Sequence, residues 1–347
     1  MNSDVRKLLT AAVAIGFTAA GIAGAVGSAN AADKSVWNFN IWGGPRAFSA
    51  GIESIKKDLE AAAPGKFELK IVYGDGLGHR KQNSENIKVG AFEAGQMCVG
   101  YYPNKYPLLS VMELPFVLPV PLEERSKVEM AVMAHDDIAA ELADRWNMRF
   151  LGPSFLPAYE FMGNKRIETV EDMKGVKMRI SGLNAKALMV FGAVPTMVQA
   201  PEGYTALDRG TIDSFGFPYS YAFGVYKLYE VSKYVTEGLA MGGFMCFQGV
   251  NRDAWKKAPS AVRAALPAAQ QNAIGALIKA YRAGDKKWIP IFRKKLEVVK
   301  ISPATRAKVA AGAGKIWKEW TTAQDAKGRP GSKMLKFVHE QVKKAAM

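Results

Sequence analysis

The side chains best suited to catalysis or metal binding are few and widely spaced. The histidines are His79, His135 and His339, and the cysteines are Cys98 and Cys246. None has a further cysteine, histidine or carboxylate at the spacing of a metal site. The serines show no nucleophile-elbow pattern, and no histidine lies in the sequence context of a catalytic triad. The sequence therefore predicts no catalytic residue, no metal and no cofactor.

A glycine-rich segment, Gly74-Asp75-Gly76-Leu77-Gly78, is a candidate for phosphate binding. It lacks the Gly-Lys-Ser/Thr ending of a phosphate-binding loop and the full dinucleotide fingerprint. We expect a turn between a strand and a helix instead.

Residues 1–31 have the pattern of a cleavable secretory signal. Arg6 and Lys7 precede an almost uncharged apolar stretch, and Ala29-Asn30-Ala31 ends it with a small-x-small cleavage pattern. No later segment reaches the roughly 18 uninterrupted apolar residues of a membrane span. We therefore expect cleavage after Ala31 and a soluble, exported protein.

Export leaves two alternatives for Cys98 and Cys246. An oxidising compartment permits a disulfide. However, both residues lie in short apolar runs, and the sequence cannot place their Cα atoms within bonding range. We favour two buried free thiols over a bridge.

The chain is strongly basic, with a formal net charge of +15 over 347 residues. Such an excess raises the local concentration of anions. A nucleic-acid-binding protein would gather its basic residues into a stripe or patch, whereas here they are scattered through the chain. We therefore expect no nucleic-acid partner.

The hydrophobic pattern predicts an α/β fold, because extended and helical segments alternate along the chain. The first unit has strands over 36–42, 67–73 and 97–102, separated by helices over 48–63 and 84–93. A second unit follows with extended segments over 149–155, 160–163, 176–180, 196–198 and 211–217, a helical turn over 170–174, and helices over 184–191 and 201–209.

The remainder from Ser260 onward is almost wholly helical in pattern, with Pro267, Pro290 and Pro303 as expected breaks or starts. Ligands of open α/β sheets bind beyond the carboxyl ends of the strands. Binding residues are therefore expected in the loops that follow Trp42, Tyr73, Tyr102 and Ile180.

The most specific motifs lie between Asn164 and Pro218. In chain order they are Glu171–Arg179, Gly192–Thr196 and Glu202–Asp213, preceded upstream by Gly76-Leu77-Gly78 and Leu114-Pro115-Phe116. Together they resemble the DctP-like solute-binding proteins of TRAP (tripartite ATP-independent periplasmic) transporters, over most of the mature chain.

The resemblance implies two α/β lobes that are joined by crossing strands and enclose a ligand cleft, with a helical C-terminal tail. Lobe I would comprise residues 32–156 and 245–284, and lobe II residues 157–244 and 285–347.

The resemblance also implies that Arg179 binds the ligand carboxylate. Its planar guanidinium can hold a carboxylate by two charge-assisted hydrogen bonds. Relatives that bind sialic acid or four-carbon dicarboxylates often carry a second arginine upstream and an asparagine before a later proline, where this sequence has Tyr159 and Phe217. Two aromatic rings in place of polar groups predict a monocarboxylate with an aromatic or long aliphatic body.

The remaining candidate ligand-binding residues are almost all aromatic. Each aromatic residue alone is more typical of a core than of a pocket. These candidates are Trp42, His79, Tyr101, Phe155, Tyr219 and Phe244.

These expectations predict a monomeric periplasmic protein, not an enzyme, that captures a small organic acid and passes it to the membrane subunits of a TRAP transporter. A periplasmic enzyme acting on the same acid is an alternative, and it would need an acid, base or nucleophile beside Arg179. A sensor that presents the ligand to a signalling protein is another.

Overall fold

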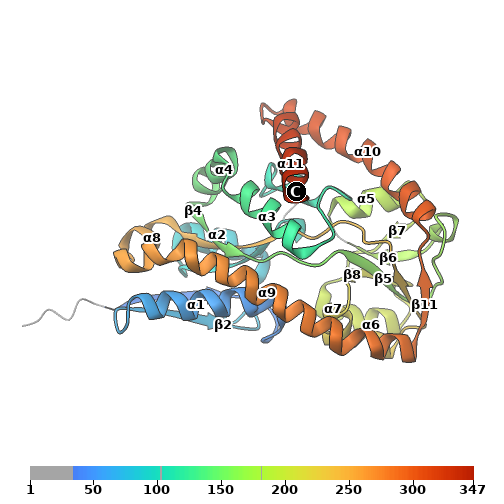
Figure 1. The fold of residues 1–347 in the computed structure, drawn as a ribbon, viewed down its shortest axis with the longest axis horizontal. Helices are drawn as coiled ribbons and strands as arrows, with labels where there is room; N and C mark the ends of the chain where they lie inside the picture. The colour runs from blue at the N-terminus through green and yellow to red at the C-terminus, as the bar shows by residue number, and fades with distance from the viewer. Residues whose placement is uncertain (1–33, 102–103, 181) are drawn as a thin grey trace, which may run out of the picture. The chain divides into compact units, whose positions relative to one another are not determined.

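The computed structural model describes residues 34–101, 104–180 and 182–347, in which helices surround two β-sheets (Figure 1). The predicted signal, residues 1–31, lies outside the described residues. The predicted α/β class is confirmed. In the described part of the chain, no helix is both long and apolar enough to cross a membrane.

The first sheet has the strand order β2-β1-β3-β10-β4. β1 lies parallel to β2 and β3, while β10 lies antiparallel between β3 and β4. The strands are β1 (Ser35–Asn40), β2 (Phe67–Val72), β3 (Ala94–Cys98), β4 (Met148–Pro153) and β10 (Cys246–Asn251). Its helices are α1 (Ala50–Ala62), α2 (Asn83–Val89), α3 (Leu122–Met133), α4 (Asp136–Trp146) and α8 (Arg252–Lys257).

The second sheet has the strand order β11-β9-β5-β8-β6-β7. β6 lies parallel to β7 and β8, and β5 lies antiparallel to β8 and β9. The strands are β5 (Tyr159–Gly163), β6 (Lys177–Arg179), β7 (Val194–Pro195), β8 (Ser214–Pro218), β9 (Tyr234–Glu237) and β11 (Glu297–Lys300). The short helices between them are α5 (Leu183–Met189), α6 (Gly203–Asp208) and α7 (Tyr221–Val225).

The chain passes between the sheets after β4 and again before β10. α9 (Ser260–Lys295) makes a third connection, because it packs on α1 and β4 and also contacts α7 and β11 (Figure 1). α10 (Pro303–Asp325) and α11 (Gly331–Ala345) complete the tail.

The expected breaks at Pro267 and Pro290 are wrong, because both prolines lie inside α9. Each ring is exposed to solvent, where water can bind the carbonyl that loses its helical partner. The buried face of the helix compensates for the lost bonds by packing on α1. Pro303 starts α10, as predicted. The tail also contains β11, a strand of 4 residues that its pattern did not reveal.

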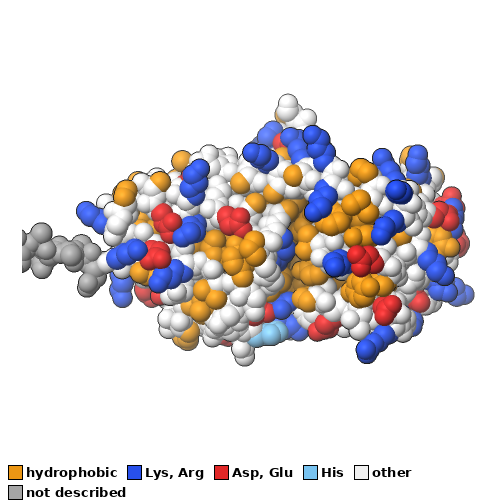
Figure 2. All heavy atoms as spheres, turned by 90° about the horizontal axis from the view of Figure 1, so that it is seen from below, with side chains coloured by type: hydrophobic (Ala, Val, Ile, Leu, Met, Phe, Trp, Pro, Cys, Tyr) orange, Lys and Arg blue, Asp and Glu red, His pale blue; other side chains and the backbone are white. Residues whose placement is uncertain are grey.

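On the face shown in Figure 2, Lys and Arg side chains are spread widely rather than gathered into one stripe. This arrangement agrees with the scatter of basic residues along the sequence.

The two cysteines form a disulfide, so the preference for free thiols is wrong. β3 and β10 are antiparallel neighbours, and their register places Cys98 opposite Cys246 with a Cα–Cα distance of 4.0 Å. The two residues are 148 positions apart in the chain. Only the pairing of distant strands brings them together, and no local pattern encodes that pairing.

A disulfide between residues 148 positions apart lowers the conformational entropy of the unfolded chain and so stabilises the folded state. The double variant Cys98→Ser/Cys246→Ser should therefore lose about 2–4 kcal/mol of unfolding free energy in a urea titration. Wild type reduced with dithiothreitol should behave like the double variant. Titration of both thiols in unreduced, unfolded protein would contradict the bridge.

Candidate functional site

A small cavity lies where loops that follow strands of both sheets meet. The centres of water molecules can occupy about 30 Å³ of it, room for about two waters. An organic acid with a ring would need the loops or lobes around it to move apart. The lining is mainly aromatic and consists of Trp42, Arg46, Phe48, Cys98, Tyr101, Leu156, Tyr159, Arg179, Ala200, Phe217, Tyr221, Tyr226, Phe244 and Cys246.

Arg179, the last residue of β6, brings a buried charge to this cavity. Its side chain is 2% exposed. Nε donates to the carbonyl of Val198 at 3.0 Å, and Nη1 lies 3.4 Å from the carbonyl of Gly216. The guanidinium carbon is 4.5 Å from the ring centre of Phe215 and 5.1 Å from that of Phe217. These contacts fix the plane of the guanidinium against two aromatic faces.

The charge of Arg179 has no ion-pair partner among the residues that the structure describes. Its polar neighbour Tyr101 does not supply one, since burial raises the pKa of that hydroxyl while Arg179 acts in the opposite direction. A buried cation without an anion is costly. The site therefore favours a negatively charged ligand.

Aromatic rings from both sheets surround this charge. On the first-sheet side, Tyr101 lies 5.8 Å from Trp42 and 4.9 Å from Phe244 between ring centres. On the second-sheet side, Phe217 contacts Tyr159 edge-on at 6.3 Å and Tyr226 at 5.5 Å. Such a lining suits an apolar or aromatic ligand body.

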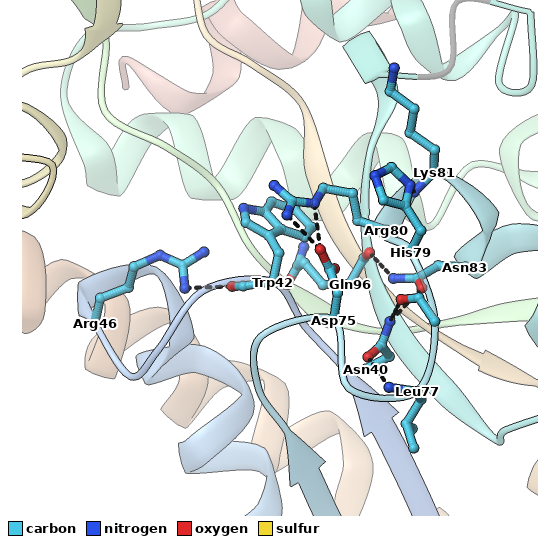
Figure 3. A network of polar contacts seen from close by, with 11 residues as sticks. Asn40, Trp42, Arg46, Asp75, Leu77, His79, Arg80, Lys81, Asn83 and Gln96 are labelled. Carbon is cyan, nitrogen blue, oxygen red and sulfur yellow. Dashed lines mark hydrogen bonds and ion pairs between the residues drawn. The ribbon is translucent and has the colours of Figure 1, made fainter. Parts of the chain in front are cut away.

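A polar network holds the first-sheet loops in place (Figure 3). Asn40, at the end of β1, donates to Asn83 and to the carbonyl of Gly78, both at 2.8 Å, and accepts from the amide of Leu77. Asn83 in turn donates to the carbonyl of Gln96. The segment 74–78 is thus a turn between β2 and the helix that follows, as predicted, and it is fastened to the end of β1.

The sequence model of the bacterial extracellular solute-binding proteins of family 7, the DctP family, matches residues 47–324. The chain belongs to this family. The resemblance predicted from the motifs is confirmed.

Solved structures of TRAP solute-binding proteins share the fold of this family member. One from Desulfovibrio salexigens with bound orotic acid has a TM-score of 0.79 at 21% identity, with 90% of this chain and 100% of that chain covered. Another, from Rhodoferax ferrireducens in complex with copurified benzoate, has a TM-score of 0.79 at 20% identity, with 90% and 98% covered.

A solute-binding protein of Verminephrobacter eiseniae is 26% identical over 191 residues, which are 53% of this chain and 55% of that relative. The match thus spans about half the length of that relative.

Six of the nine predicted ligand-binding residues of this family member line the cavity, namely Trp42, Tyr101, Tyr159, Arg179, Phe217 and Phe244. The other three lie outside the lining. Phe155 is fully buried beside Tyr281, Tyr219 donates to Glu237 at 2.5 Å, and His79 caps a short helical turn by accepting from the amide of Lys81.

Several lining residues were not predicted. Tyr221 and Tyr226 come from α7 and its end, and Arg46 and Phe48 follow β1. The loop after Trp42 was an expected ligand-binding position, so it could have pointed to Arg46. Nothing in the sequence pattern distinguishes the two tyrosines from core residues.

The buried carboxyl group of Glu113 lies next to the loops that carry the lining residues Tyr101 and Phe244. Glu113 accepts from the amide of Met245 at 3.3 Å. A Cβ atom at Gly100 would lie 2.2 Å from the Phe244 ring and 2.8 Å from Glu113 Oε2, so glycine lets both side chains approach the loop before Tyr101. Burial raises the pKa of Glu113 to about 8.

The raised pKa of Glu113 predicts a pH dependence of stability. Since the folded state holds this proton more tightly than the unfolded chain, the contribution is complete below about pH 4.5 and is lost as the pH rises toward 8. Glu113→Gln stays neutral, so its melting temperature relative to wild type should be higher at pH 8 than at pH 5. Glu319→Gln, on the exposed surface of α10, is the control. An equal difference at both pH values would contradict this assignment.

Proposed function

We propose that this chain is the periplasmic ligand-binding subunit of a TRAP transporter, and that it captures a monocarboxylate with an aromatic or apolar body. The observation that carries the proposal is Arg179, a buried guanidinium at the cavity with no ion-pair partner among the described residues. Its remaining N–H groups match the two oxygens of a carboxylate.

The ligand body follows from the rings around Arg179. Tyr159 and Phe217 are 2% and 8% exposed, and both line the cavity. A second carboxylate placed against these two rings would lose its hydration and gain at most the Tyr159 hydroxyl as a donor. An aromatic ring would instead stack on their faces. Two similar structures, with bound orotic acid and benzoate, hold acids of this kind.

The lining also supports binding without catalysis. The lining residues that the structure describes include no histidine, aspartate or glutamate, so no side chain of these types is placed to move a proton near Arg179. Membership of a solute-binding family agrees with this proposal.

Delivery to a transporter requires the ligand to enter and leave. We propose the lobe division stated above, 32–156 with 245–284 and 157–244 with 285–347, with a hinge at the chain passages between the sheets. A ligand that contacts both lobes stabilises the closed state by its differential affinity for it. The signal pattern of residues 1–31 supports a periplasmic location.

Removing the guanidinium should sharply weaken binding. Arg179→Ala should lose at least about 2 kcal/mol of affinity for benzoate, because the buried carboxylate is left unpaired, which is roughly thirtyfold in Kd. Arg179→Lys should recover only part, since an ammonium lacks the planar fork. Isothermal titration calorimetry measures both. Arg209→Ala removes an exposed arginine that does not line the cavity and is the matched control. Normal binding by Arg179→Ala would overturn the assigned role.

The aromatic wall should set the ligand class. Wild type should bind benzoate or phenylacetate well ahead of succinate, and Phe217→Asn should narrow that preference by adding an amide where the ring now lies. Calorimetry of all three acids on both proteins gives the ratios. Tighter binding of succinate than of either aromatic acid by wild type would refute the ligand class and leave the family assignment standing.

A further inference from the structure

A second guanidinium, that of Arg46, lines the same cavity from the first-sheet side. Arg46 lies in the loop after β1, whereas Arg179 ends β6 of the second sheet. Figure 3 shows the Arg46 side chain turned back toward Trp42. Its Nη1 donates to the carbonyls of Trp42 and Gly44, both at 2.8 Å. The two charges thus reach the cavity from different sheets.

The loop holds the Arg46 side chain in one orientation. Its guanidinium carbon lies 5.0 Å from the ring centre of Phe48 and 5.9 Å from that of Trp42, and its amide donates to Ser49 Oγ at 2.9 Å. Gly43 has φ +66°, and a Cβ atom there would lie 2.9 Å from Nη1. Glycine therefore allows the guanidinium to fold back over the loop, where it is positioned before any ligand arrives.

One edge of this positioned group remains available. Both hydrogen bonds that the Arg46 side chain donates use Nη1, so within the described residues the Nε and Nη2 donors have no protein acceptor. No described carboxylate pairs with Arg46 either. The neighbouring Arg80 differs, because it forms an ion pair with Asp75 at 2.5 Å. The Nε and Nη2 donors lie on one side of the planar group and can bind an oxygen acceptor together.

We propose that Arg46 determines specificity by binding a second oxygen of the ligand. This inference rests on the proposed function, in which Arg179 takes the carboxylate. Arg46 is only half-buried, so water already solvates its charge and a neutral hydroxyl or carbonyl oxygen is sufficient. The substrate class is then an aromatic acid that carries a hydroxyl or carbonyl group on its ring, rather than an unsubstituted one.

The competing role for Arg46 is purely structural, as a brace for the loop after β1. The two roles differ in what they do to selectivity. If Arg46 only stabilises the loop, its loss disturbs the whole cavity and lowers the affinity for all acids by the same factor. If Arg46 contacts the ligand, its loss lowers the affinity only for those acids that present the second oxygen.

The experiment is calorimetry of benzoate, 3-hydroxybenzoate and 4-hydroxybenzoate on wild type, Arg46→Gln, Arg179→Ala and Ser49→Ala. Wild type should bind at least one hydroxybenzoate about fivefold or more tighter than benzoate, as expected for a hydrogen bond to a charged donor. Arg46→Gln should bring that ratio near one while its Kd for benzoate changes by less than about threefold. Ser49→Ala removes a loop hydrogen bond but keeps the guanidinium, so the ratio should survive. Circular dichroism checks that each variant is folded.

The outcomes separate the two proposals. If Arg46→Gln keeps the wild-type ratio of the Kd values for benzoate and the hydroxybenzoates, even with a lower affinity for all three acids, Arg46 only stabilises the loop and this inference fails. It also fails if wild type prefers benzoate to both hydroxybenzoates. If Arg179→Ala binds benzoate as wild type does, or wild type binds none of these acids, the proposed function itself fails.

Discussion

The buried guanidinium of Arg179 is the constraint on which the site depends. A full positive charge is held almost out of water, against two aromatic faces and two backbone carbonyls. Carbonyl dipoles and ring faces orient such a group but cannot neutralise it. The remaining requirement is an anion, and the shape of a carboxylate meets it with two parallel hydrogen bonds. In the proposed function, binding of an acid would therefore also neutralise the buried charge of Arg179.

The surrounding structure keeps that charge in place. β6 is only 3 residues long, yet it lies between β7 and β8, so its last side chain is positioned by a sheet. On the other side, the disulfide joins the ends of β3 and β10 directly at the cavity, since both cysteines line it. The disulfide thereby holds in place the backbone next to Tyr101 and Phe244, which lie close to the two cysteines in the sequence. The side chains at these strand ends are thus held by a sheet or a disulfide, and the proposed hinge lies in the chain passages between the sheets.

Burial affects acidic and basic groups in opposite ways in this molecule. Basic side chains are spread over the face of the molecule seen in Figure 2, where water solvates them and where they attract anions. Inside, burial raises the pKa of Glu113 and of Glu129 to about 8, which favours the neutral forms of both carboxyl groups. Arginine cannot respond in this way, because its guanidinium keeps its proton. Arg179 is therefore a buried group of the cavity lining that keeps its charge.

The sequence by itself determined the α/β class, the family and the position of Arg179 at a strand end, because alternation of strand and helix and the motif Glu171–Arg179 are local patterns. It also placed the turn over 74–78, since a cluster of glycines favours a turn whatever the rest of the fold. Only the tertiary structure decided which rings line the cavity: Phe155 is buried in the core, whereas Tyr221 lines the cavity. The pairing of the cysteines and the turn of Arg46 into the site were likewise undetermined. These features depend on how two sheets and distant strands pack against each other, and no periodicity along the chain records such contacts.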